Sequence, residues 1–300
     1  MTATTSMGAR AADGAVVSAR LFAPEQPADA THLVLLAGAF AVRQRYYARF
    51  ARDLVERGLA VVTVDYRGVG ESRHSMPPGS GRRARSGKAP MRQHPARATD
   101  WVLDLDAAVH AARHHIPDAP LVVVGHSFGG QVLPLMAHAD EISRVVTVGT
   151  QFAHPSLWQG WERVRMETIL RAAIPGLVAT AGYLPGWSGI GEDVPGRVAA
   201  DWARWCRSRR YLLDHVDGAE QAFSAFTAPV EAIAVTDDDY APPAGVELYA
   251  SFLPNSEVSR IAPEDLGLST LGHFGPFRPD ARVLWEQVAA ALVDGAREVA

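Results

Sequence analysis

The stretch LVVVGHSFGG, residues 121–130, predicts a buried strand that turns sharply into a helix. Its first four residues are apolar, and Ser127 lies between Gly125 and Gly129. A serine at such a corner adopts strained backbone angles that require very small flanking residues. The strain would lift the hydroxyl of Ser127 clear of the sheet, where it could react. The same Gly-x-Ser-x-Gly pentapeptide also fits a tight glycine turn whose serine only caps a helix. Evidence from the rest of the chain is needed to choose between these two interpretations.

Strand and helix patterns alternate on both sides of this corner. Strands are predicted by the apolar runs at 15–23, 32–37, 59–68, 121–125, 144–150, 229–236 and 257–262, and helices by the spacing at 43–58, 98–114, 131–140, 244–252 and 281–294. Such alternation predicts an α/β fold with a mostly parallel, doubly wound sheet and right-handed crossovers. The nearly continuous apolar runs are typical of strands that are buried on both faces.

The alternation stops after residue 150. Residues 151–226 show helical stretches interrupted by proline and glycine, and five of the seven tryptophans lie there. We therefore expect one core domain, residues 1–150 and 227–300, with a helical insertion at 151–226 that follows the strand at 144–150.

Composition excludes several classes of protein. The net charge of −4 implies neither a nucleic-acid partner nor a membrane surface. The single cysteine, Cys206, rules out an internal disulfide and fits a reducing compartment. The N-terminus lacks the apolar core of a signal peptide, and no apolar run approaches the ~20 residues that span a bilayer. We expect a soluble, cytoplasmic protein, with its oligomeric state left open.

A nucleophilic serine needs a base, and the base needs a carboxylate that orients it. After the corner, TDDDYAPP places Asp237, Asp238 and Asp239 at the end of a strand. LGHFGPF places His273 in a loop ahead of the last helix. His126, beside the serine, is too constrained to act as the base and is interpreted as a packing and hydrogen-bonding residue. No spacing of His, Cys and Asp resembles a zinc site.

The chain resembles the α/β-hydrolase superfamily over nearly its full length. The resemblance rests on LLAGAF (35–40), VTVDYRGVGES (62–72), GHSFGG (125–130), TDDDYAPP (236–243) and LGHFGPF (271–277), in this order. Within the superfamily it is most similar to bacterial hydrolases of the serine aminopeptidase and monoacylglycerol-lipase-like branch. The usual His-Gly of the oxyanion loop is replaced by Ala37-Gly38, which leaves a backbone donor available.

The resemblance implies a carboxylesterase-like serine hydrolase that acts on a small molecule through an acyl-enzyme and needs no metal or organic cofactor. It also implies that the insertion at 151–226 is a helical cap, or lid, placed after the sixth strand of the superfamily's sheet. Ser127 would be the nucleophile and His273 the base. In hydrolases with this strand ending the acid lies four residues before the proline, which is Pro242 here, so Asp238 is chosen over its neighbours.

Acyl transfer also needs two N–H donors for the developing oxyanion. The first is the backbone N–H of Phe128, the residue after the nucleophile. For the second, the loop after the strand 32–37 favours the N–H of Ala39 over that of Phe40.

Aromatic residues around the serine favour an ester, or an amide or thioester, with an apolar portion. The proposed pocket residues are Phe40, Gln151, Trp158, Trp161 and Phe274. The tryptophans of the insertion could instead anchor it to the core domain. A peptidase would need an acid that binds the substrate ammonium group, for which Glu162, Glu167 and Glu192 are the candidates.

Two other functions stay open at this point. An acyltransferase or a lyase could use the same triad, and a binding protein could retain the fold without catalysis. The segment from Ser72 to Thr99 carries six arginines and Lys88 without an acid. We expect it to be a solvated, mobile surface loop, with a role at the site entrance or toward anionic substrates as the alternative.

Overall fold

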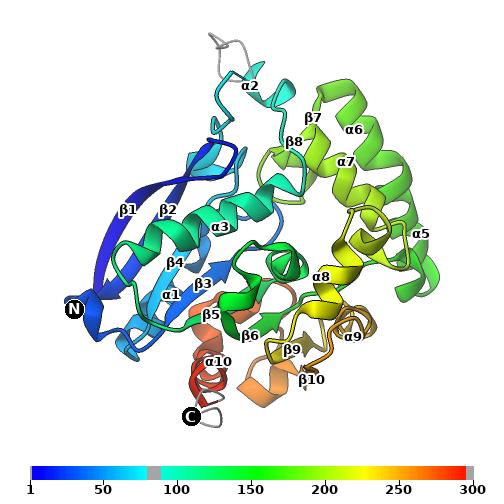
Figure 1. Ribbon diagram of the computed structural model, residues 1–300. Coiled ribbons are helices and arrows are strands. Elements are labelled where there is room, and N and C mark those ends of the chain that lie inside the picture. The colour runs from blue at the N-terminus through cyan, green and yellow to red at the C-terminus, as the bar shows by residue number, and fades with distance from the viewer. Residues whose placement is uncertain (1, 80–88, 295–300) are drawn as a thin grey trace.

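The computed structural model describes residues 2–79 and 89–294, and an eight-stranded sheet runs through its centre (Figure 1). The strand order is β1-β2-β4-β3-β5-β6-β9-β10. The strands are β1 (Thr2–Arg10), β2 (Val16–Pro24), β3 (Leu33–Ala37), β4 (Ala60–Val64), β5 (Leu121–His126), β6 (Ile142–Val148), β9 (Val230–Val235) and β10 (Ser256–Ile261). The pairs β1–β2 and β2–β4 are antiparallel, and all the pairs from β4 to β10 are parallel. This confirms the predicted doubly wound, mostly parallel sheet.

Helices cover both faces of the sheet. In β3, alternate residues belong to different cores: Leu33 and Leu35 face one cluster of buried side chains, and Val34 and Leu36 face the other. The first cluster includes α3, and the second includes α1 and α10. This period of two explains why β3 is apolar throughout. The helices are α1 (Ala48–Glu56), α3 (Asp100–Arg113), α9 (Pro243–Ala250) and α10 (Arg282–Asp294).

The first strand, β1, was not predicted. It pairs with β2 from Thr2 opposite Pro24 to Arg10 opposite Val16. Most of its residues are exposed, because it is an edge strand with one neighbour. A polar edge strand lacks the apolar run on which strand prediction depends.

The helix predicted at 131–140 is wrong. The helix α4 covers Phe128–Gln131, and two short 3₁₀ turns follow at Leu133–Leu135 and Ala139–Glu141. Pro134 has no N–H and clashes with the preceding turn, so it prevents a long helix. The strand predicted at 59–68 is also shorter than expected and ends at Val64.

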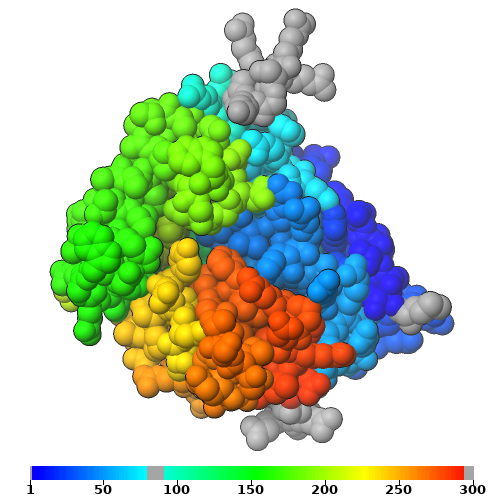
Figure 2. Space-filling model, turned by 180° about the vertical axis from the view of Figure 1, so that it is seen from behind, coloured from blue at the N-terminus to red at the C-terminus, as the bar shows by residue number. Residues whose placement is uncertain are grey.

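Residues 151–226, here called the helical segment, connect β6 to β9 and lie beside the sheet (Figure 1). From behind, a hollow is visible where this green segment meets the blue and orange parts of the molecule (Figure 2). Its elements are α5 (Gly160–Thr168), a π-helical turn (Ile169–Ala173), α6 (Ile174–Ala181), α7 (Gly196–Trp205) and α8 (Ala219–Ala225), with the two-residue strands β7 (Tyr183–Leu184) and β8 (Val194–Pro195). No strand was expected here, and β7 and β8 are too short for a sequence pattern.

The arginine-rich loop makes contacts with the helical segment. Arg73 pairs with Asp193 at 2.6 Å, and Arg97 pairs with Asp201 at 3.3 Å. A short helix, α2 (Ala89–Arg92), lies in the same loop. Lys88 and the arginines at 82, 83 and 85 lie outside the described residues. Arg73 and Arg97 thus find their acids in the helical segment, and Arg92 donates to the carbonyl of Thr180 in the same segment at 3.1 Å.

The described helices include none with the length and apolar composition needed to cross a bilayer.

Candidate active site

The serine corner has the strained geometry that its glycines suggest. Ser127 follows β5 with φ 52° and ψ −119°, and its side chain does not cap the helix α4. A Cβ atom on Gly129 would lie 2.1 Å from the carbonyl oxygen of Ala37, and one on Gly125 would lie 2.7 Å from Cα of Gly130. Glycine is therefore required at both positions. A corner that holds a positive-φ serine without using it as a cap leaves the hydroxyl free for another role.

The three aspartates after β9 have different partners. Oδ2 of Asp238 lies 2.6 Å from Nδ1 of His273, and Oδ1 of Asp238 accepts the N–H groups of Tyr240 and Ala241 at 2.8 Å each. The Asp238 side chain is fully buried. The side chain of Asp239 is exposed. Among the three, Asp238 is the carboxylate that contacts the imidazole.

Asp237 holds the loop that carries the histidine. Its carboxylate accepts the N–H groups of Leu271 and Gly272 at 2.9 and 2.8 Å and the hydroxyl of Thr270 at 2.9 Å. Burial alone would raise the pKa of Asp237, but these hydrogen bonds outweigh it and hold the pKa below its ordinary value. Sequence analysis treated Asp237 as an alternative to Asp238, and the structure gives it a separate contact.

Ser127 and His273 both line a cavity of about 340 Å³. Both residues are largely buried, with 8% exposure each. They approach from different elements: the serine from the end of β5, and the histidine from the loop between β10 and α10. The cavity therefore lies at the carboxyl edge of the parallel strands, where open α/β sheets place their ligands.

Four of the five pocket residues proposed from sequence lie in the cavity wall, namely Phe40, Gln151, Trp158 and Phe274. Trp161 is a correction, because it is 74% exposed and does not line the cavity. It stands in the first turn of α5, before the turns that reach the wall.

The helical segment supplies an apolar wall that sequence analysis did not identify. Its lining side chains include Met166, Ile169, Ala173, Ile174 and Leu177. Met166, Ile169, Ala173 and Leu177 recur three or four positions apart, so they lie on one side of the α5–π–α6 helix. That spacing is visible in the sequence, whereas the pocket prediction for this segment rested on its tryptophans. Arg165 is the one permanently charged side chain among the described residues of the wall.

The backbone donors near the serine are not equivalent. The N–H of Ala39 donates to the hydroxyl of Tyr47 at 2.8 Å, so this amide is already paired. Within the described part of the chain, the N–H groups of Phe40 and Phe128 have no hydrogen-bond partner. Phe40 and Ser127 both line the cavity.

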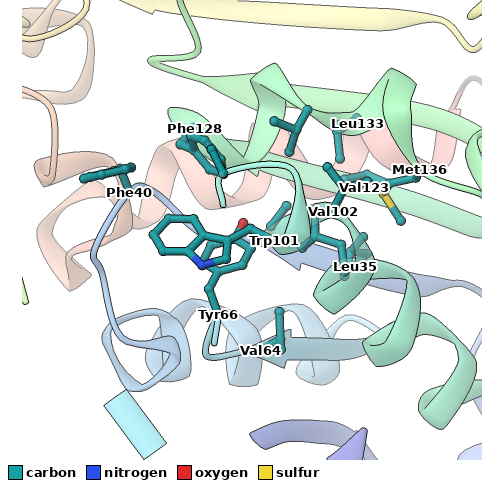
Figure 3. Close-up of a cluster of buried hydrophobic side chains, with 14 of the residues drawn as sticks. Leu35, Phe40, Val64, Tyr66, Trp101, Val102, Val123, Phe128, Leu133 and Met136 are labelled. Atoms are coloured by element: carbon teal, nitrogen blue, oxygen red, sulfur yellow. The ribbon is translucent and has the colours of Figure 1, made fainter. Parts of the chain in front are cut away.

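An aromatic cluster joins the loop after β3 to the start of α4, which carry these two donors. Figure 3 shows Phe40, Tyr66, Trp101 and Phe128 within one cluster of buried side chains. Trp101 stacks on Tyr66 at 4.6 Å between ring centroids and lies 5.3 Å from Phe40 and 5.2 Å from Phe128. Such pairs stabilise a fold by about 0.5–1.5 kcal/mol each beyond their buried area. The rings therefore hold the loop after β3 against the start of α4.

The sheet order, the positive-φ serine after β5 and the buried Asp–His pair define an α/β-hydrolase. Residues 43–259, more than half of the chain, match the family described as serine aminopeptidase, S33. The chain belongs to this family, and it is an α/β hydrolase. No match is found among curated proteins.

Solved structures share this fold at low sequence identity. Est1E from Butyrivibrio proteoclasticus, solved with ferulic acid bound, is 17% identical, with a TM-score of 0.61 over 97% of this chain and 100% of its own. A hypothetical protein from Pseudomonas aeruginosa is 14% identical, with a TM-score of 0.64 over 98% and 94%. An esterase from Exiguobacterium antarcticum is 14% identical, with a TM-score of 0.60 over 96% and 99%.

Proposed function

We propose that the protein is a serine hydrolase of carboxylic esters with an apolar portion. Ser127 is the nucleophile, His273 the general base and acid, and Asp238 the carboxylate that orients the imidazole. The observation that carries this proposal is the 2.6 Å contact between Asp238 and His273 beside a cavity that Ser127 also lines.

The reaction follows from which nitrogen of His273 is free. Nδ1 faces the Asp238 carboxylate, so Nε2 takes the proton of the Ser127 hydroxyl as Oγ attacks the ester carbonyl. The C–O bond to the alcohol then breaks, and Nε2 returns the proton to the leaving oxygen. Water enters, gives a proton to Nε2 and attacks the acyl-enzyme. The acid leaves, and the proton returns to Ser127.

For the oxyanion we assign Phe128 and Phe40 as the N–H donors. Ala39 was favoured from sequence, but its amide is engaged with the Tyr47 hydroxyl. The amide of Phe40, which was the alternative, is unpaired within the described residues and belongs to a cavity-lining residue. One such donor contributes about 3 kcal/mol to the transition state.

The apolar wall supports an ester substrate rather than a peptide. A peptidase acting on free N-termini needs an acid inside the cavity, and the candidates do not line it. Each of them pairs with an arginine instead: Glu162 with Arg165, Glu167 with Arg171, and Glu192 with Arg43. The aminopeptidase activity in the family description is therefore not the one we propose here.

We further propose that residues 151–226 act as the cap of a core formed by residues 1–150 and 227–300. The segment contributes the apolar residues of α5, the π-helical turn and α6 to the cavity that holds Ser127. In this arrangement the core carries the chemistry, and the cap selects the apolar portion of the substrate.

The test compares wild-type protein with Ser127→Ala, using a fluorophosphonate probe and p-nitrophenyl esters of increasing chain length. We expect labelling and turnover in the wild type and loss of both in the variant. Labelling with negligible turnover would favour an acyltransferase or a lyase with the same triad. Absence of labelling in the wild type would contradict the proposal and leave a binding protein.

A further inference from the structure

A chain of buried hydrogen bonds connects the loop after β3 to the loop that carries His273. The hydroxyl of Tyr47 lies 2.8 Å from the amide nitrogen of Ala39 and 2.8 Å from Nδ1 of His126. At the other side of the same ring, Nε2 of His126 lies 3.0 Å from the carbonyl oxygen of His273. Tyr47 and His126 are completely buried, so water does not compete for these contacts.

The partners determine where each proton lies. A carbonyl oxygen can only accept, so Nε2 of His126 carries a hydrogen and donates it to His273. In a neutral imidazole Nδ1 then accepts, and the Tyr47 hydroxyl donates to it. The oxygen of Tyr47 in turn accepts the N–H of Ala39. Each donor in the chain therefore has one acceptor, and all the bonds run in one direction.

Burial maintains the neutral forms that this arrangement needs. It lowers the pKa of His126 well below its ordinary value, and the nearby His273 lowers it further. Burial likewise raises the pKa of Tyr47, which keeps the hydroxyl proton in place.

The residues on either side of His273 have other hydrogen-bond partners, whereas the backbone of His273 bonds to His126. Asp237 holds the N–H groups of Leu271 and Gly272, and the hydroxyl of Tyr46 donates to the carbonyl of Phe274. Between these anchors, the main chain of His273 is held through Nε2 of His126. The two histidine rings are also in contact, with centroids 4.9 Å apart.

We propose that His126 is a positioning residue for the general base. By holding the carbonyl of His273 it keeps the imidazole between Asp238 and Ser127, and through Tyr47 it fixes the neighbouring amide of the oxyanion loop. This role rests on the proposed function, in which His273 exchanges the proton.

Two variants separate the two hydrogen bonds of His126. In His126→Gln the terminal amide falls near the place of Nε2 and can still donate to the carbonyl of His273. In His126→Asn the shorter amide falls near Nδ1 and can contact Tyr47, but it cannot reach that carbonyl. Misplacement of a reacting group by about 1 Å costs roughly a hundredfold in rate. We therefore expect kcat to fall roughly tenfold to a hundredfold in His126→Asn and roughly twofold to fivefold in His126→Gln, with KM nearly unchanged in both.

Tyr47→Phe and Tyr249→Phe form a matched control pair. Both tyrosines are almost completely buried. The hydroxyl of Tyr249, however, donates to the carbonyl of Gly130, which does not belong to the series of hydrogen bonds through His126. We expect Tyr47→Phe to lower kcat, and Tyr249→Phe to lower the melting temperature by a similar amount while kcat stays near that of the wild type. If both lower kcat equally, the loss reflects general destabilisation, and the positioning role is overturned.

Rates of fluorophosphonate labelling distinguish the two proposals. Slower labelling of His126→Asn than of His126→Gln would support the positioning role. Equal rates in wild type, His126→Gln and His126→Asn would overturn that role while leaving the hydrolase intact. A wild-type protein that is not labelled would overturn the proposed function, and the positioning role with it.

Discussion

The two walls of the cavity are built in different ways. The wall at the sheet edge holds polar groups in fixed contacts, such as the Asp238–His273 bond and the strained Ser127. The wall from the helical segment is mainly apolar, with side chains such as Met166 and Ile174 and without a network of hydrogen bonds between them. Hydrogen bonds demand distance and direction, whereas apolar contact demands only volume. We therefore expect substitutions in the first wall to change kcat, and those in the second to change the choice of substrate.

The largest effect is expected from Asp238→Asn. Loss of the carboxylate allows the wrong tautomer of His273, which lowers kcat by about 10⁴-fold in triads of this kind. Asp237→Asn is the matched control, because Asp237 bonds to the loop and not to the imidazole. Steady-state kinetics on a short p-nitrophenyl ester measure both. A larger loss in Asp237→Asn would transfer the role of the acid to that residue.

A substitution at Gly191, in the helical segment, is expected to affect the wall at the sheet edge as well. Gly191 belongs to the helical segment, but a Cβ there would lie 2.6 Å from the carbonyl oxygen of Ala41, next to the oxyanion loop. We expect Gly191→Ala to displace the Phe40 amide and to lower kcat roughly tenfold or more.

Gly189→Ala controls for backbone strain in the same loop. Gly189 also has positive φ, but a Cβ there would meet nothing within 4 Å. Equal values of kcat for Gly191→Ala and Gly189→Ala would show that the two walls are independent.

The choice of chain length tests the apolar wall directly. Ile169→Trp fills part of the cavity, so we expect kcat/KM for octanoate esters to fall about tenfold to a hundredfold while acetate esters change little. Val164→Trp is the control, since Val164 is 52% exposed on α5 and does not line the cavity. An equal loss for both ester lengths in Ile169→Trp would show that this wall does not select the acyl chain.

The smallest effect is expected from Trp161→Ala. Its side chain is largely exposed, and surface substitutions change stability by only about 0.5 kcal/mol. We expect kcat/KM on soluble esters and the melting temperature to remain close to those of the wild type. A substantial loss of activity would return Trp161 to the substrate pocket, where sequence analysis had placed it.

Local patterns explain what could be predicted from the sequence. The Ser127 corner depends on glycines within a few residues, and the parallel strands depend on apolar runs, so both can be recognised without coordinates. The loop positions of Asp238 and His273 followed from chain order within the superfamily. The structure adds which atoms of the two side chains meet, Oδ2 of Asp238 and Nδ1 of His273, and the sequence could not supply this.

Contacts between distant residues could not be predicted in the same way. The hydroxyl of Tyr47 accepts the N–H of Ala39, and His126 bonds to the carbonyl of His273, 147 residues further along the chain. Neither bond leaves a pattern in the sequence, because backbone groups occur at every position. The exposure of a single side chain is equally hard to predict. A tryptophan such as Trp161 gives the same sequence signal whether it lines a cavity or faces water.

The most direct measurement of the central claim is a crystal structure of the wild-type protein after reaction with an alkyl phosphonate ester. We expect a phosphorus–oxygen bond to Oγ of Ser127, a phosphonyl oxygen within hydrogen-bonding distance of the amides of Phe128 and Phe40, and Nε2 of His273 beside the adduct. The alkyl chain should lie along α5 and α6. An adduct on another residue, or an imidazole turned away from the phosphonylated serine, would contradict the account.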